Sequence, residues 1–178
     1  GTARCRIGLV TRPVLSYVTA GFAYGGVKSS LTETIAGAPA SIAFDRTRTG
    51  WTWGSGVEAS LGGNWTGKLE YMYVDLGNTS DTFLLQGATQ TLNTKIHENI
   101  FRAGLNYRIG GNGAYSPIAA ANWTGFYLGG NVGSGTGRDH SSLAAVDNPQ
   151  FNLSPDGYLG GVQAGYNWQA ANWVYGVE

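Results

Sequence analysis

The sequence has little of what soluble enzymes and nucleic-acid-binding domains use. Cys5 is its single cysteine, which excludes an internal disulfide framework and a thiolate metal site. Charged residues make up 12% of the chain, about half of the usual share, and the net charge is zero. Without a basic surface, nucleic acid is not expected as a partner. No stretch approaches the roughly 18 apolar residues that a membrane helix needs.

Glycine and aromatic residues are abundant instead. The chain has 29 glycines, and Phe, Trp and Tyr make up 12% of its 178 residues, a length that suits one domain. A mixture of Val, Thr, Tyr, Trp and Gly favours strands over helices. We therefore expect an all-β protein.

Polar and apolar residues alternate along the chain, which is typical of strands with two unlike faces. In 2–10, Arg4 and Arg6 alternate with small and aliphatic residues, among which Cys5 falls on the apolar side. In 97–109, Arg102 alternates with Phe101 and other apolar residues. The apolar side carries large aromatics, and the polar side carries charges and small residues. Such strands suit a barrel whose outer surface faces lipid.

Eight strand-like segments follow from this alternation: 2–10, 14–25, 50–61, 65–76, 97–109, 123–133, 157–168 and 173–178. Short turns at 11–13, 62–64 and 169–172 alternate with long polar connections, which we expect to be loops, at 26–49, 77–96 and 134–156. An even strand number and alternating connection lengths predict an eight-stranded antiparallel transmembrane β-barrel with its turns in the periplasm and its loops outside the cell. Residues 110–122 are expected to form a linker between two sequence units, within one barrel over 1–178.

The interior of an eight-stranded barrel is just wide enough for side chains to fill it. Unpaired charges would be costly there, so we expect salt bridges and a plugged lumen. Inward glycines such as Gly56, Gly104 and Gly165 would make room for long side chains. By parity, the predicted lumen charge network comprises Arg4, Arg6, Glu58, Lys68, Glu70, Arg102, Arg108 and Glu178, accompanied by Asn106, Gln163 and Asn167.

Tryptophans gather where strands meet connections. Indole rings prefer the lipid–water interface, so two aromatic girdles are expected. The predicted membrane-interface tryptophans are Trp51 and Trp53 at the long-loop end, and Trp65, Trp123, Trp168 and Trp173 at the short-turn end.

Catalytic chemistry is not indicated. Hydrolytic sites need a nucleophile with a base in reach, and the only histidines are His97, at a strand start, and His140, in a long connection. Asp139, His140 and Ser141 are consecutive in sequence, which is poor geometry for a triad. We predict no catalytic residue, no cofactor and no metal site.

Specific segments resemble a known family. Residues 122–133 (NWTGFYLGGNVG) and 157–178 (GYLGGVQAGYNWQAANWVYGVE) resemble the first three strands of the alphaproteobacterial 25/31-kilodalton outer-membrane proteins, a branch of the OmpA-like eight-stranded barrels. Residues 51–76 and 97–109 resemble that family's last three strands, and 2–25 its fourth and fifth. Thus 1–109 corresponds to family strands four to eight and 123–178 to strands one to three. This order is that of a circular permutant or of a junction between tandem copies. Closing all eight strands into one barrel requires 173–178 to pair with 2–10; alternatively, five strands belong to one barrel and three to the next.

The resemblance implies a multi-pass protein of the bacterial outer membrane, in contact with its lipid and lipopolysaccharide. It implies a surface antigen with a role in envelope integrity, and some relatives bind haem or host surfaces. Our leading hypothesis is a non-enzymatic barrel that supports the envelope and displays its loops. A narrow porin-like channel, an adhesin or haem-type receptor acting through loops 26–49, 77–96 and 134–156, and a soluble ligand carrier remain as alternatives.

Overall fold

A computed structural model describes the backbone of the chain apart from residues 12, 36–37, 86–87, 110–121, 145–149 and 154–155. Side chains are described outside residues 12, 27–46, 79–95, 110–121 and 138–156. The predicted linker 110–122 therefore lies outside the described residues, except for Asn122. Within the described part, no helix has the length and hydropathy to cross a membrane.

Strands account for nearly all of the described backbone. Their bounds are β1 (Thr2–Thr11), β2 (Val14–Ile35), β3 (Ala38–Gly62), β4 (Trp65–Leu85), β5 (Ala88–Ile109), β6 (Gly125–Ala144), β7 (Gln150–Leu153), β8 (Asp156–Ala170) and β9 (Trp173–Val177).

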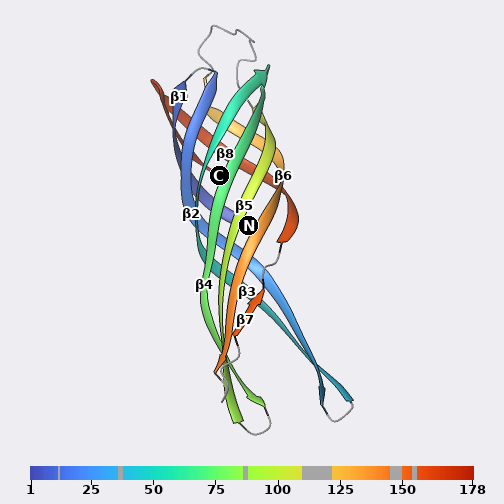
Figure 1. The fold of residues 1–178 in the computed structure, drawn as a ribbon. Helices are drawn as coiled ribbons and strands as arrows, with labels where there is room; N and C mark the ends of the chain where they lie inside the picture. Colours follow the sequence, from blue (N-terminus) through green and yellow to red (C-terminus); the bar gives the residue numbers. More distant parts are fainter. Residues whose placement is uncertain (12, 36–37, 86–87, 110–121, 145–149, 154–155) are drawn as a thin grey trace.

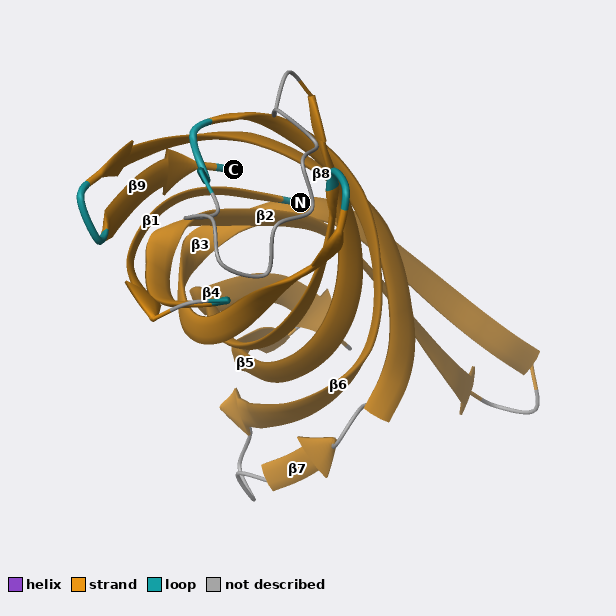
Figure 2. Ribbon diagram, turned by 90° about the horizontal axis from the view of Figure 1, so that it is seen from above, coloured by secondary structure: helices purple, strands orange, loops and turns teal. Residues whose placement is uncertain are grey.

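Eight of these strands close into a ring, as predicted. Every pairing is antiparallel, in the order β5-β4-β3-β2-β1-β9-β8-β6, and β5 pairs with β6 to complete the circle. Figure 2 shows this ring from above. The short β7 pairs only with the far part of β6.

The first and last strands are neighbours, as the permuted order requires. Ile7 pairs with Tyr175 in the β1–β9 register. Beyond the end of β9, the amide of Arg4 donates to the Glu178 carbonyl (2.7 Å) and the amide of Glu178 donates back to the Arg4 carbonyl (2.8 Å).

The long connections differ from the expected loops. At 26–49 and 77–96 the strands continue as paired hairpins, to Ile35 opposite Ala38 and to Leu85 opposite Ala88. In 134–156, β6 runs on to Ala144 and pairs with β7. These segments are rich in Ser and Thr, and threonine fits a paired strand well. Figure 1 shows the β2–β3 and β4–β5 hairpins reaching far beyond the ring, opposite the short turns. We call the end of the ring from which these hairpins extend the hairpin end, and the opposite end the short-turn end.

The two faces of the wall differ as the alternation predicts. In β1 the burial alternates residue by residue, with Arg4 and Arg6 buried and Ile7 and Leu9 about 40% exposed. Leu69 on β4 is 63% exposed, whereas its neighbours Lys68 and Glu70 are at most 4% exposed. The outside is therefore apolar and the inside is polar.

An arginine on the outer face should destabilise the barrel according to depth. Leu105 lies in the middle of the ring portion of β5. The substitution Leu105→Arg should lower the unfolding free energy of the barrel in lipid vesicles by about 2–4 kcal/mol. Ile109→Arg, at the short-turn end of the same strand, should lose about 0–1 kcal/mol. Urea unfolding measures both, and equal small losses would contradict a lipid-facing belt.

A charged lumen as the candidate functional site

The largest cluster of charged side chains described in the lumen joins five of them, from three strands and the chain end. We call this set, Arg4, Lys68, Glu70, Arg102 and Glu178, the upper network. Arg4 Nη1 donates to Glu70 Oε1 (3.1 Å), and Arg4 also bonds Glu178. Arg102 bridges the same two carboxylates, with 3.1 Å from its Nη2 to Glu178 Oε1. Lys68 Nζ lies 3.2 Å from Glu178 Oε2 and 3.8 Å from Glu70 Oε2.

Two tyrosines add hydrogen bonds to this network. The Tyr17 hydroxyl donates to Glu70 Oε1 (3.1 Å), and the Tyr127 hydroxyl donates to Glu178 Oε2 (2.8 Å). The sequence interpretation missed both, although Tyr17 shares the inward parity of Thr19 on β2. Each carboxylate thus accepts bonds from cations and from a hydroxyl, an arrangement that stabilises buried ionised groups.

A second cluster, the lower network, centres on Glu58. Arg6 Nη1 donates to Glu58 Oε2 (3.0 Å), and Asn106 Nδ2 donates to Glu58 Oε1 (2.8 Å). The Thr66 hydroxyl donates to the same Oε1 atom. Two more amide side chains extend this network. Gln163 Nε2 donates to Asn106 Oδ1, and Gln163 Oε1 accepts from Asn131 Nδ2.

Arg6 of the lower network also contacts the two tyrosines that bond to the upper network. Its guanidinium carbon is 4.9 Å from the Tyr17 ring centroid and 5.2 Å from that of Tyr127. Glycines allow these rings to lie against the wall, because a Cβ on Gly56 would meet Tyr17 and a Cβ on Gly165 would meet Tyr127. Gly104 faces Lys68, so inward glycines accommodate both rings and long cations.

Arg108 and Trp123 lie elsewhere than predicted. Arg108 is not joined to the lumen carboxylates by any described contact; it donates to the carbonyls of Asn122 (2.8 Å) and Gly63 (3.4 Å), because the end of β5 places it at the short-turn mouth. Its guanidinium carbon lies 5.6 Å from the centroid of the Trp123 ring.

Trp123 is 1% exposed, so it is not a membrane-interface residue. The predicted strand 123–133 begins only at Gly125, whose φ of 134° favours glycine and lets the preceding residues leave the wall. The Asn122 Oδ1 atom accepts from the Thr124 amide (2.9 Å), and Gln169 Oε1 accepts from the Trp123 amide (2.8 Å). These bonds hold the indole across the short-turn mouth.

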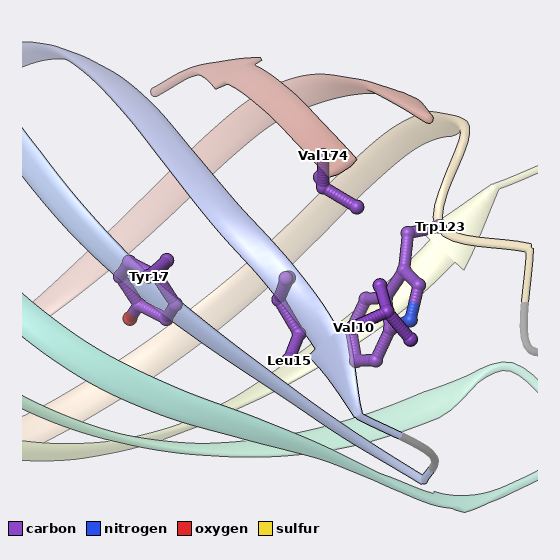
Figure 3. Packing of buried hydrophobic residues seen from close by; sticks show 5 residues of the cluster. All are labelled: Val10, Leu15, Tyr17, Trp123 and Val174. Atoms are coloured by element: carbon purple, nitrogen blue, oxygen red, sulfur yellow. The ribbon is translucent and has the colours of Figure 1, made fainter. Parts of the chain in front are cut away.

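Inside the mouth, Trp123 completes a small apolar core. Figure 3 shows it beside Val10, Leu15 and Val174, with Tyr17 deeper in the lumen. Leu15 and Val174 are fully buried. The lumen is therefore apolar at its short-turn end and charged farther in.

The other five tryptophans lie on the outer face near the two ends of the ring. Trp51 and Trp53 are at the hairpin end, and Trp65, Trp168 and Trp173 are at the short-turn end. Each is about half exposed, between 46% and 51%.

In the described part of the chain, no histidine is hydrogen-bonded to a serine, threonine or cysteine side chain that could act as a nucleophile. His97 contacts Asp75 and Tyr73 on the outer face, and no described Ser, Thr or Cys side chain bonds to it. His140, Asp139 and Ser141 lie outside the described side chains. Among the described residues, no three His, Cys, Asp or Glu side chains gather as a metal site requires.

A polar lumen inside an apolar ring is the arrangement of outer-membrane barrels. The family model of the outer membrane protein beta-barrel domain matches residues 1–108. The chain belongs to this family. It is an outer-membrane β-barrel protein.

Curated relatives agree with this assignment. The chain is 38% identical to a 31 kDa outer-membrane immunogenic protein of Brucella melitensis over 61% of its own length and 44% of the relative. It is 35% identical to a 25 kDa outer-membrane immunogenic protein of the same species, over 61% and 45%. A 22 kDa outer membrane protein of Rhizobium leguminosarum bv. viciae is 40% identical over 42% and 32%. The chain thus spans a little under half of the length of the first relatives, and no solved structure matches it.

Replacing one partner of a buried ion pair should lower the unfolding free energy more than replacing both partners. Glu58→Leu leaves Arg6 without its carboxylate and should lower the unfolding free energy by about 3–5 kcal/mol. The double variant Arg6→Met/Glu58→Leu should recover part of that loss. Urea unfolding in vesicles measures these losses and that of Arg6→Met alone. A double variant whose loss equals the sum of the two single-variant losses would contradict the pairing.

Removing the buried ring of Trp123 should destabilise the barrel more than removing a half-exposed ring at the membrane interface. Trp123→Ala opens a cavity in a packed core and should cost about 3–5 kcal/mol. Trp65→Ala, which removes a half-exposed ring at the same end, is the matched control and should cost less. Urea unfolding in vesicles measures both losses. Equal losses would contradict the packing of Trp123 in the apolar core of the lumen.

Proposed function

We propose that the chain forms a non-conducting, non-enzymatic barrel that supports the outer membrane and presents its hairpins to the cell exterior. Its immediate partners would be outer-membrane lipid and lipopolysaccharide. The observation that carries this proposal is the filled lumen, in which two charge networks and an apolar core lie in series along the barrel.

The upper network supports the closed state because it ties opposite parts of the ring together. Glu70 on β4 and Glu178 beside β9 share the guanidinium groups of Arg4 and Arg102, which come from β1 and β5. Opening a path for ions would separate these charges in an enclosed space, which is costly. Trp123 adds a second closure at the short-turn mouth.

A narrow channel is the second candidate, and one observation favours it. A cavity of about 530 Å³ lies on the hairpin side of the upper network, with Met72, Ile100, Arg102 and Glu178 among its lining residues. Water and small solutes could enter this far from the hairpin end. Conduction would still require the upper network and the Trp123 core to move aside.

A receptor or adhesin function would reside in 26–49, 77–96 and 134–156. Hairpins on a rigid barrel are suitable for contacts outside the cell. Two of the relatives are named immunogenic proteins, which supports exposure of such segments. Most of the side chains that would contact an adhesion partner or a haem-type ligand lie outside the described set.

Planar-bilayer recording separates the barrel support from the channel. The refolded chain should insert without steady openings, because both closures are in place. A variant carrying Arg4→Ser, Glu70→Ser, Arg102→Ser and Trp123→Ala should conduct if it folds, and it serves as the control that insertion is detectable. Steady, sizeable openings of the unmodified chain would refute the closed lumen.

Envelope support and display have separate tests. Deleting the gene should raise the sensitivity of cells to detergent, and the plasmid-borne chain should restore resistance. An epitope inserted between residues 86 and 87 should be labelled on intact cells. Labelling only after cell lysis would contradict the orientation, and unchanged detergent sensitivity would contradict the supporting role.

A further inference from the structure

A hydrogen-bonded polar cluster lies on the outer face at the hairpin end of the ring. Asp75 of β4 pairs in register with His97 of β5. His97 Nδ1 lies 3.4 Å from Asp75 Oδ2 and 2.8 Å from the Tyr73 hydroxyl. Asp75 Oδ1 accepts from the Gly77 amide (2.7 Å), which fixes the carboxylate. These groups share the parity of Leu69, so they face away from the lumen.

Aromatic rings surround this cluster across three strands. Trp51 lies 5.6 Å from Tyr73, Trp53 lies 6.2 Å from Tyr71, and Tyr71 lies 4.9 Å from Phe101, measured between ring centroids. The His97 ring stacks on Tyr73 at 5.8 Å. We call this set, Trp51, Trp53, Tyr71, Tyr73, His97 and Phe101, the aromatic patch.

Hydrogen bonds fix the two tyrosines and the histidine of the patch, and the other rings pack against them. The Tyr71 hydroxyl donates to Asn99 Oδ1 (2.7 Å), and the Tyr73 hydroxyl bonds to His97. The two indoles remain about half exposed, so their surfaces are available to a molecule beside the barrel. A preformed surface of this kind loses little conformational entropy on binding.

The short-turn end lacks the polar half of this arrangement. Its described aromatic pairs are Trp65 with Tyr107, Phe126 with Tyr166, and Tyr166 with Trp168. The Asn64 amide donates to the Tyr107 hydroxyl (3.4 Å), but no described carboxylate or imidazole adjoins these rings. An ordinary interfacial girdle is therefore sufficient there, whereas the hairpin end has additional hydrogen-bonding groups.

These two features together match the surface of a sugar. Pyranose rings carry C–H groups that pack against aromatic faces, and their hydroxyls require carboxylate, amide or imidazole partners. Phosphate recognition alone would need clustered Lys or Arg. The described outer-face residues of the patch include neither, so phosphate is not the group that this patch would recognise.

We propose that the aromatic patch with Asp75 and Asn99 binds a sugar ring in the headgroup of an outer-leaflet glycolipid. Interfacial aromatic rings lie at headgroup level, and the hairpin end faces the outer leaflet in the orientation proposed above, on which this inference rests. The acyl chains of the same lipid would run along the apolar wall past Phe101 and Leu69. The barrel thereby has one preferred lipid neighbour on the β3–β5 side.

Native mass spectrometry of the refolded chain in detergent tests the proposal. The probe is lipid A, whose headgroup is a phosphorylated glucosamine disaccharide, and phosphatidylglycerol is the sugar-free anionic comparison. Trp51→Leu and His97→Gln should each weaken lipid A binding about tenfold, equivalent to about 1.4 kcal/mol. Asp75→Asn keeps the side-chain shape but removes the carboxylate as an acceptor, and it should weaken lipid A binding as well.

Trp168→Leu is the matched control, because it removes a half-exposed indole from the opposite end. It should leave lipid A binding unchanged, and phosphatidylglycerol binding should be the same in every variant. Heat-dependent gel mobility reports folding in each case. Lipid A binding that is equal in all folded variants, or phosphatidylglycerol that competes as strongly as lipid A, would overturn the proposal. Surface labelling of the 86/87 epitope is independent, so a wrong orientation would be recognised separately.

Discussion

The structure depends on the neutralisation of charge inside a closed wall. Arginine, lysine and glutamate side chains fill a lumen that an apolar outer surface separates from lipid, and each carboxylate is stable there only with cations and donors around it. Glu70 illustrates this, because Arg4, Lys68 and Arg102 surround it while the Tyr17 hydroxyl donates to it. These contacts come from β1, β2, β4 and β5, so lumen electrostatics and the strand order of the ring depend on each other.

The two ends of the barrel meet different requirements. At the short-turn end, the lumen ends in an apolar core under Trp123, and Arg108 lies over the indole where the wall reaches solvent. At the hairpin end, the lumen holds a cavity beside a second buried apolar cluster, Ala23, Met72 and Val74, and the outer face adds polar groups to its aromatics. The two ends therefore differ in what lines the lumen and the outer face, which is consistent with an outer-membrane protein whose strands extend beyond the ring as hairpins at one end.

The sequence predicted the ring and most of the lumen, because alternation with period two survives in every strand of the wall. It placed Arg4 and Glu70 on the inward side, where the structure pairs them. It placed Trp123 in a girdle wrongly, because parity holds only within a strand and the chain leaves the wall before Gly125. It assigned Arg108 to the charge network because parity does not report depth along the barrel. The hairpins were expected as loops because Ser and Thr occur in loops and in paired strands alike.

The alternation of lipid and lumen contact along one strand is the most direct test of the account. Single nitroxide labels can be placed at each position of 99–109 on β5 after Cys5→Ser removes the native thiol, and their collisions with oxygen and with a water-soluble nickel complex can be compared in vesicles. Positions 101, 103, 105 and 107 should favour oxygen, and 102, 104 and 106 should not. A uniform profile, or oxygen preference at 102 and 106, would contradict an apolar exterior around a charged lumen.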